Sequence, residues 1–239
     1  MASSKGRALI TGASSGIGRA TALAFAEAGI DLILVSRSQE KLNTVAAKVE
    51  QIGVKVQTHS LDLANVDQVQ AAIRTIVADQ SIDILVNSAG IGYTHELAET
   101  SLKDWQYVLD INLTSVFQCI QAVLPRMRDR QQGTIINVAS IAAHSAFPGW
   151  GAYSVSKAGL ISLSKVLSVE ERVHGIRVVV ITPGAVNTSL WDTDTVQADF
   201  DRSQMLTPEV VAQSILHAAL LPSQAVINEL TVMPSAGAL

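Results

Sequence analysis

The sequence predicts an α/β fold: one doubly wound domain with a parallel, seven-stranded sheet and helices on both faces. Short apolar runs rich in β-branched residues alternate with longer helical patterns along the 239 residues, which is typical of parallel α/β sheets. The runs are continuously hydrophobic, as expected of strands buried on both faces. The length suits a single domain, because single cores stop growing near about 250–300 residues.

Each element is predicted from its local pattern: strands from the short apolar runs, helices from apolar residues that recur with helical spacing. The predicted strands are Arg7–Thr11, Asp31–Val35, Val54–Thr58, Ile82–Val86, Thr134–Val138, Ile176–Ile181 and Asn228–Val232. The predicted helices are Ile17–Ala28, Gln39–Gln51, Val66–Asp79, Leu102–Arg130, Tyr153–His174 and Pro208–Leu221.

Two segments interrupt this alternation. Residues 141–152 contain Pro148, Gly149 and Gly151 and are expected to form a loop between a strand and a helix. Residues 187–206 are rich in Asp and Thr, and they are longer than an ordinary connection. Because this second segment follows the carboxyl end of a strand, we expect it to be a substrate lid.

The composition excludes several classes of protein. Hydrophobic residues make up 48% of the chain, and 17 basic against 21 acidic residues leave a net charge of −4. This balance excludes a disordered chain and argues against nucleic acid or an anionic membrane as the main partner. Cys119 is the only cysteine, so no internal disulfide is expected. We find no signal-peptide core and no uninterrupted apolar span, and we therefore expect a cytoplasmic protein.

A glycine-rich turn follows the first predicted strand and precedes the first predicted helix. It reads Thr11-Gly-Ala-Ser-Ser-Gly-Ile-Gly18. Gly12 permits the tight turn, Gly16 allows the backbone to approach a pyrophosphate, and Gly18 lets the helix pack on the strand. The helix N-terminus offers N–H groups and a positive dipole end to phosphates. This position favours dinucleotide binding, although the spacing is GxxxGxG and not GxGxxG.

The end of the second predicted strand indicates which dinucleotide binds. The acidic residue that would bond the adenosine ribose is missing, and Ser36-Arg37 stands there instead. Arg37 can pair with a 2′-phosphate, which a carboxylate would repel, and Ser36 leaves room for it. The sequence therefore predicts NADP(H), unless Arg37 is simply a solvated residue at a helix start.

Tyr153 and Lys157 lie four residues apart in a predicted helix and so share one face. A free tyrosine has a pKa of about 10, and a nearby ammonium lowers that pKa toward the working range of an acid–base catalyst. Ser140 at the end of the fifth predicted strand and Asn112 within a helix accompany the pair.

With these motifs the chain resembles the short-chain dehydrogenase/reductase family, which has a Rossmann-like fold, over nearly its whole length. The resemblance rests on these residues: Thr11–Gly18, Asn87-Ser88-Ala89-Gly90, Asn112, Ser140, Tyr153-x-x-x-Lys157 and Pro183-Gly184. The family motif reads Asn-Asn-Ala-Gly or Asn-Ala-Ala-Gly, and this chain has another small residue, Ser88, at its second position. The resemblance implies that Tyr153 is the general acid–base, that Ser140 bonds the substrate, that Lys157 bonds the nicotinamide ribose, and that Asn112 holds a relay water.

The resemblance also implies contacts to NADP(H), with Asp62 on the adenine and Thr188 on the carboxamide. The expected cofactor-binding residues are Gly12, Ser14, Ser15, Gly16, Ile17, Gly18, Ser36, Arg37, Asp62, Leu63, Asn87, Ala89, Gly90, Tyr153, Lys157, Pro183, Gly184, Val186 and Thr188. The candidates for lining a substrate pocket are Tyr93, His144, Phe147, Trp150 and Trp191. The histidines and the single cysteine form no spaced ligand set, so no metal is expected.

The leading hypothesis is therefore an NADPH-dependent carbonyl reductase acting on a small ketone, keto-ester or hydroxy-acid-type carbonyl. A 3-oxoacyl-[acyl-carrier-protein] reductase remains the alternative, but relatives of that kind commonly end in Val-Asp-Gly-Gly, and this chain does not. A nucleotide-sensing scaffold would have lost Tyr153, Lys157 or Ser140. A sugar-nucleotide epimerase would need a longer C-terminal portion.

Helix Tyr153–His174 is apolar on more than one side, which predicts a homo-oligomer, and the resemblance suggests a tetramer or a dimer.

Overall fold

The computed structural model describes residues 5–197 and 201–237, and it contains a sheet of parallel strands. The strands are β1 (Arg7–Thr11), β2 (Asp31–Ser36), β3 (Val56–Ser60), β4 (Ile84–Asn87), β5 (Gly133–Val138), β6 (Ile176–Pro183) and β7 (Glu229–Val232). Their order in the 7-stranded sheet is β3-β2-β1-β4-β5-β6-β7. The predicted doubly wound α/β fold is confirmed.

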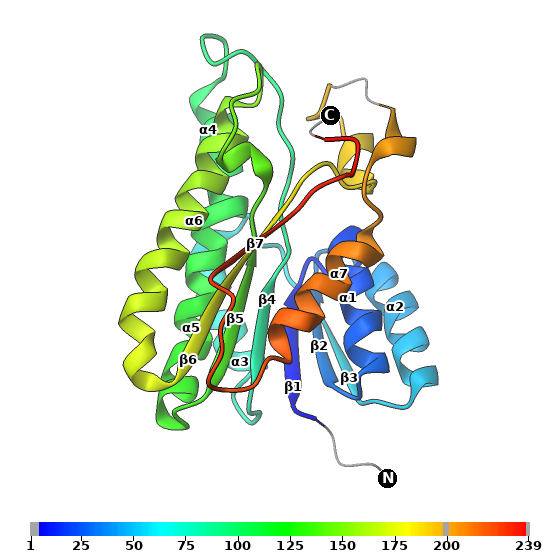
Figure 1. Ribbon diagram of the computed structural model, residues 1–239, viewed down its shortest axis with the longest axis vertical. Helices are drawn as coiled ribbons and strands as arrows, with labels where there is room; N and C mark the ends of the chain where they lie inside the picture. Colours follow the sequence, from blue (N-terminus) through cyan, green and yellow to red (C-terminus); the bar gives the residue numbers. More distant parts are fainter. Residues whose placement is uncertain (1–4, 198–200, 238–239) are drawn as a thin grey trace.

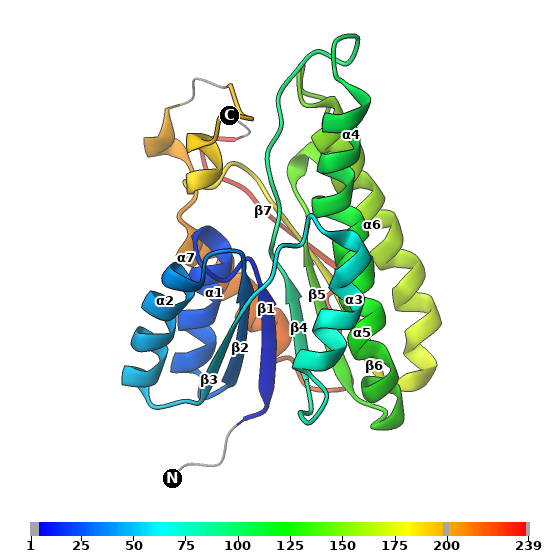
Figure 2. The ribbon, with the colours of Figure 1, turned by 180° about the vertical axis from the view of Figure 1, so that it is seen from behind.

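Helices cover both faces of this sheet (Figures 1 and 2). They are α1 (Gly16–Glu27), α2 (Gln39–Ile52), α3 (Val66–Ile76), α4 (Leu102–Leu109), α5 (Ser115–Asp129), α6 (Gly151–Glu171) and α7 (Pro208–Ala219). Helices α1, α2 and α7 pack on one face, and α3, α5 and α6 pack on the other. Helix α4 and the segment that follows β6 rise above the carboxyl ends of the strands at the top of Figure 1.

The continuous apolar runs of the sequence are explained by burial on both sides of the sheet. In β1, Ala8 and Ile10 belong to the core under α1 and α7, whereas Leu9 belongs to the core under α3 and α5. The edge strand β3 begins two residues later than predicted, at Val56, where it pairs with Leu32 of β2. Side chains there are half-buried or exposed, so the apolar pattern is a weak guide to its start.

The long helix predicted over Leu102–Arg130 is interrupted. A π-helical turn, Asp110–Thr114, separates α4 from α5 and adds one residue to the local turn. The apolar periodicity runs through this turn, so the sequence pattern did not reveal it.

By length and composition, residues 102–129 are apolar enough to cross a membrane. The search for uninterrupted apolar runs did not identify this segment. In the structure 56% of that apolar window is buried inside the protein, as in the core helix of a sheet.

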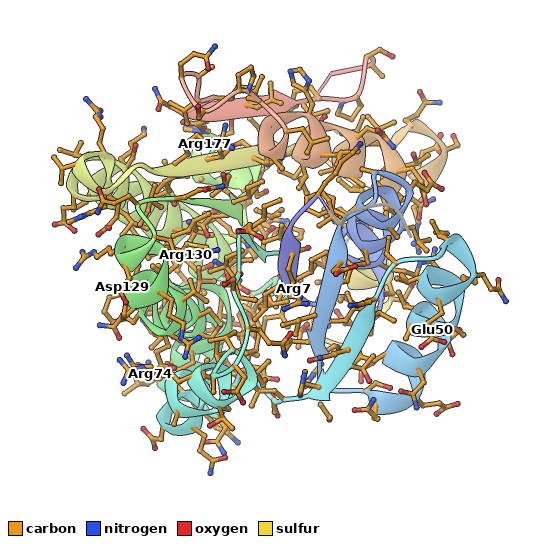
Figure 3. All side chains as sticks on the ribbon, turned by 90° about the horizontal axis from the view of Figure 1, so that it is seen from below. Arg7, Glu50, Arg74, Asp129, Arg130 and Arg177 are labelled. Atoms are coloured by element: carbon orange, nitrogen blue, oxygen red, sulfur yellow. The ribbon has the colours of Figure 1, made fainter. Side chains whose placement is uncertain are left out.

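Charged side chains at the amino ends of the strands serve the fold. Figure 3 shows Arg7, Arg130 and Arg177 at this lower end of the molecule. Arg130 Nη1 lies 2.8 Å from Asp83 Oδ1, and the other oxygen of Asp83 accepts from the Arg7 backbone N–H at 2.8 Å. Arg177 donates to backbone carbonyls that follow α7, among them Leu221 O at 2.7 Å. These contacts tie the strand starts together at the edge opposite to the candidate site.

The outer sides of α5 and α6 remain apolar and uncovered by the rest of the described chain. Phe117, Val155, Val166 and Val169 are 43%, 47%, 54% and 67% exposed. The second apolar side of the α6 segment is therefore not buried under a neighbouring helix of the same chain. Exposed apolar patches of this kind mark interaction surfaces.

A buried polar ladder joins β4, β5 and α6. Asn87 Nδ2 donates to Asn137 Oδ1 at 2.8 Å, and Asn137 Nδ2 donates to Ser164 Oγ, also at 2.8 Å. Ser164 in turn donates to the Leu160 carbonyl at 2.7 Å. All three polar side chains are buried. Within a dry core each of these groups depends on its partner, because water cannot replace it.

We expect Asn137→Ala to lower the free energy of unfolding by about 2–4 kcal/mol, because it leaves the buried Asn87 N–H without an acceptor and removes the donor to Ser164 Oγ. Urea denaturation measures the change. The control is Asn43→Ala, which removes an exposed side chain bonded only to Gln39 and should cost less than about 0.5 kcal/mol. Equal effects for the two variants would show that the ladder does not stabilise the fold.

Candidate active site

Two adjoining hollows open at the carboxyl ends of the strands. A groove of about 260 Å³ runs over the glycine-rich turn and the ends of β2 and β4. A second cavity of about 150 Å³ lies over the ends of β5 and β6, beside the start of α6. The two share the lining residues Ile17, Ser88, Gly90, Thr188 and Leu190. The strand order reverses between β1 and β4 at this place, which is where open α/β sheets bind their ligands.

The glycine-rich turn is shaped to receive phosphate. Gly12 and Gly16 have φ values of +66° and +50°, and a Cβ on Gly18 would collide with the Gly12 carbonyl. Helix α1 begins at Gly16, its N-cap residue Ser15 makes no side-chain cap hydrogen bond, and its first turn has no acidic residue. The backbone N–H groups and the positive helix end are therefore directed at the groove without a competing anion.

The end of β2 closes the groove with a polar and a cationic side chain. The hydroxyls of Ser14 and Ser36 are 2.7 Å apart, which joins the glycine-rich turn to β2. Arg37 lines the groove and is exposed. Among the described residues no carboxylate forms an ion pair with its guanidinium. A phosphate could therefore bind it without displacing a partner.

Most residues predicted to bind the cofactor line one of the two hollows. The groove is lined by Gly12, Ser14, Ser15, Gly16, Ile17, Gly18, Ser36, Arg37, Asp62, Leu63, Ala89, Gly90 and Thr188. The second cavity is lined by Tyr153, Lys157, Pro183, Gly184 and Val186. Asn87 is the exception: it is buried behind the groove and binds Asn137. The sequence analysis missed Leu190, which lines both hollows, and only its position beside Trp191 pointed to it.

The structure brings Ser140, Tyr153 and Lys157 together on the wall of the second cavity. Burial raises the pKa of the Tyr153 phenol, and a hydrogen bond with the Ser140 side chain opposes that effect. The lowering that the sequence predicted from the Lys157 ammonium is therefore not found, because burial penalises the phenolate. Lys157 Nζ lies 5.8 Å from the centre of the Tyr153 ring and donates to the Val138 carbonyl at 3.0 Å. Burial lowers the pKa of Lys157 to about 8. The arrangement can hold a proton on the phenol beside a cation.

Asn112 lies in the π-helical turn, and its amide is engaged by its neighbours. Its Oδ1 accepts from the Ile91 N–H at 2.8 Å, and its Nδ2 donates to Ile91 O at 3.0 Å and to Ser156 Oγ at 3.1 Å. A Cβ on Gly90 would stand 3.2 Å from Asn112 Oδ1 and 3.4 Å from Lys157 Nζ. The side chain therefore holds the segment after β4 close to Lys157.

Aromatic side chains form one side of the second cavity. Phe147, Trp150 and Trp191 line it, as expected for substrate-lining residues. The Trp150 ring packs edge-to-face against Tyr153 at 5.2 Å and against Trp191 at 5.8 Å between centroids. Trp191 Nε1 donates to the Val186 carbonyl at 2.8 Å, which orients the indole.

The other two candidates for the substrate pocket lie outside the cavity. Tyr93 is 8% exposed and packs in a small core with Val108 and Ala152. His144 Nε2 lies 2.6 Å from Glu229 Oε1, which ties the loop after β5 to β7. The aromatic and ionisable character that suggested a substrate contact is used instead for packing and for an ion pair. Within residues 5–197 and 201–237, no group of three or more potential metal ligands comes together.

The first part of segment 187–206 borders the two hollows, through residues 188–191 and Thr193. The structure describes residues 187–197 and 201–206, with single 3₁₀ turns at Ser189–Asp192 and Arg202–Gln204. The remaining part of the predicted lid, residues 198–200 with Asp199, lies outside the described residues. Thr188 and Leu190 reach both hollows from this segment.

Hydrogen bonds hold this segment at its middle and at its base. Thr195 Oγ1 donates to the Gly92 carbonyl at 2.8 Å, which attaches it to the segment after β4. Arg202 donates to Asn187 Oδ1 and to the Thr188 carbonyl, each at 2.9 Å, and so braces its base. In the described geometry the segment bridges the end of β6 and the end of β4.

The lowered pKa of Lys157 predicts how stability depends on pH. Between pH about 8 and pH about 10.5 the unfolded chain holds this proton and the folded chain does not, so the free energy of unfolding rises with pH. We expect wild type to gain up to about 3 kcal/mol over Lys157→Met across this window. Denaturation at several pH values measures the difference, with Lys48→Met, an exposed site, as control. If the difference in free energy of unfolding between wild type and Lys157→Met did not change with pH, the pKa of Lys157 would be that of an ordinary lysine.

Comparisons with known proteins agree with this geometry. A family model described as short chain dehydrogenase matches residues 6–198. An uncharacterized oxidoreductase of Staphylococcus saprophyticus is 34% identical over 97% of this chain and 96% of the relative. A 3-oxoacyl-[acyl-carrier-protein] reductase of Synechocystis is 36% identical over 92% of each chain. The solved structure of an alcohol dehydrogenase from Thermococcus sibiricus complexed with 5-hydroxy-NADP has a TM-score of 0.87 and 27% identity, covering 96% of this chain and 97% of that one. The protein belongs to the short-chain dehydrogenase/reductase family of oxidoreductases.

Proposed function

We propose that this protein is an NADPH-dependent carbonyl reductase that converts a small ketone, keto-ester or hydroxy-acid-type carbonyl to the alcohol. The observation that carries the proposal is the position of Ser140, Tyr153 and Lys157 on one cavity that adjoins the phosphate-binding groove. When bound, NADPH supplies the hydride and becomes NADP⁺. The protein contributes orientation and one proton, so that C=O becomes CH–OH.

The catalytic roles follow from the positions of the side chains. The substrate carbonyl oxygen accepts hydrogen bonds from the Ser140 hydroxyl and the Tyr153 phenol, and the phenol transfers its proton to this oxygen. The raised pKa of Tyr153 keeps the phenol protonated before that transfer. The Lys157 ammonium near the ring stabilises the phenolate that is left. Asn112 acts as a positioning residue through Ile91.

NADP(H) is the expected cofactor because the groove supplies a matching group at each end. The glycine-rich turn and the start of α1 would hold the pyrophosphate, and Arg37 would hold the 2′-phosphate of the adenosine. The Thermococcus sibiricus relative, which is complexed with 5-hydroxy-NADP, supports this choice.

A 3-oxoacyl-[acyl-carrier-protein] reductase is the second candidate, favoured by the name of the Synechocystis relative. We prefer the reduction of a small carbonyl compound, because the residues after β7 differ from the Val-Asp-Gly-Gly stretch that is common among 3-oxoacyl reductases. A scaffold without catalysis is disfavoured, since the reactive side chains are present and adjacent.

Segment 187–206 serves as the lid of this site in the proposal. Its contacts with Gly92 and its position beside both hollows would let it exclude water from the reacting carbonyl. Thr188 would anchor its base on the carboxamide. A cytoplasmic location and a single functional domain are part of the same proposal.

We expect Tyr153→Phe to abolish carbonyl reduction, with a loss of at least about 10²–10⁴-fold in kcat, because only the proton donor is removed. NADPH should still bind, which fluorescence titration measures. Tyr107→Phe is the matched control, since Tyr107 is a partly exposed tyrosine on α4. Substantial activity in Tyr153→Phe would show that the acid is a different group.

We expect Arg37→Asp to weaken NADPH binding by about 10- to 150-fold and to leave NADH binding much less affected, because one charge-assisted pair to the 2′-phosphate is lost. Steady-state kinetics with each cofactor measures this. Lys48→Asp makes the same change in charge at an exposed position of α2 and should leave both cofactors unaffected. Equal use of NADPH and NADH by the wild type would contradict the assignment.

A homo-oligomer is expected to form through the exposed apolar sides of α5 and α6. Light scattering at micromolar concentration should give at least twice the chain mass of 25.3 kDa. Val169→Lys with Val166→Lys should lower that mass, because it places charges within the apolar surface. A monomeric wild type would refute the interface.

A further inference from the structure

We infer that the substrate cavity selects neutral carbonyl compounds that carry an aromatic group beside the carbonyl, and that it discriminates against substrates with a carboxylate. The inference rests on the proposed reductase function and narrows its substrate class. It depends on three features of the cavity: an apolar outer part, the absence of an available cation, and a continuous aromatic wall that leads to the reacting phenol.

The part of the cavity away from the groove is apolar. Pro183, Gly184, Val186 and Thr188 lie on the side assigned to the nicotinamide. The remaining space beside Ser140 is bounded by Ile141, Phe147, Trp150, Leu190 and Trp191. None of these five side chains is ionisable, and the Trp191 N–H is already bound to a carbonyl. A substituent on the carbonyl therefore meets carbon atoms and aromatic faces.

Within residues 5–197 and 201–237, no free cation faces this space. Among the described residues that line the cavity, the ionisable side chains are Tyr153 and Lys157. Lys157 is 4% exposed, is bound to the Val138 carbonyl, and stands next to Gly90 on the groove side. A carboxylate in the outer part would be desolvated with no ammonium or guanidinium to pair with it, which is a large penalty.

Three basic side chains on the segments that border the cavity already have acidic partners. His144 and Lys165 both contact Glu229, at 2.6 Å and 3.8 Å. Arg202 forms an ion pair with Asp192 as well as its bonds to the base of segment 187–206. His144 and Lys165 share Glu229, and Arg202 has Asp192. A carboxylate substrate would have to compete with these acids for the pairing.

The aromatic wall adds a positive preference. Trp191, Trp150 and Tyr153 pack edge-to-face in series, so the wall ends at the reacting phenol. Trp191 is oriented by its bond to Val186 O, and Trp150 immediately precedes α6, where its carbonyl accepts from Ser154 N at 2.8 Å. A planar ring attached to the carbonyl would lie along this wall, because aromatic groups favour stacked and edge-to-face contacts.

The test compares ethyl benzoylformate with benzoylformate, which share the aryl ketone and differ only in ester against carboxylate. With NADPH and the wild-type protein, we expect kcat/KM for the ester to exceed that for the acid by at least about 100-fold. Ethyl pyruvate, in which methyl replaces the phenyl ring, should fall at least about tenfold below ethyl benzoylformate.

Two variants of Phe147, on the cavity wall, distinguish the effect of adding a charge from the effect of removing the ring. Phe147→Arg places a guanidinium on the cavity wall and should reduce the preference for the ester at least about tenfold, by raising kcat/KM for benzoylformate. Phe147→Gln removes the same ring without adding charge and should not raise activity on the acid. Turnover of the ester by each variant reports that it is folded.

The outcomes are distinct. Reduction of benzoylformate as efficiently as its ester, or of ethyl pyruvate as efficiently as ethyl benzoylformate, overturns this inference and leaves the reductase function standing. Reduction of a 3-oxoacyl thioester without reduction of ethyl benzoylformate overturns both this inference and the small-carbonyl proposal, and favours the second candidate. Failure to oxidise NADPH with any carbonyl compound, while NADPH binds, overturns the proposed function itself.

Discussion

The buried ladder from Asn87 through Asn137 to Ser164 is the constraint on which the site depends. Asn87 ends β4, directly before the segment that borders the groove, and Asn137 lies three residues before Ser140. Ser164 lies on α6, the helix that also carries Tyr153 and Lys157. Amide hydrogen bonds in a dry core tolerate little displacement. The ladder therefore holds the groove, the loop after β5 and the reactive face of α6 in one fixed relation.

Burial is the second influence on the site, and it acts in opposite directions on its two titratable groups. The same dry surroundings raise the pKa of the Tyr153 phenol and lower that of Lys157. Both shifts favour the neutral forms, and they move the two pKa values apart: the phenol keeps its proton to a higher pH, and the lysine releases its proton at a lower pH, than either would in water. The charged pairs that stabilise the fold, such as Arg130 with Asp83, lie at the opposite edge of the sheet.

The two hollows are parts of one surface. Thr188 and Leu190 reach both of them, and they belong to a segment that is bound to Gly92 at its middle and braced by Arg202 at its base. The aromatic wall continues this surface from Trp191 to Tyr153. A ligand in either hollow would therefore contact the same two side chains, Thr188 and Leu190.

The sequence by itself determined the fold class, the parallel sheet, the glycine-rich turn and the candidate catalytic residues, because these depend on local patterns. Glycines in a tight turn and a Tyr–Lys spacing of four need only their neighbours in the chain. Only the tertiary structure decided the break at Asp110–Thr114, the burial of Asn87 and Tyr93, and the pairing of His144 with Glu229. His144 and Glu229 are 85 positions apart in the sequence, so no local pattern predicts their contact. A side chain's partner, and hence its use, is set by packing between elements that are distant in the sequence.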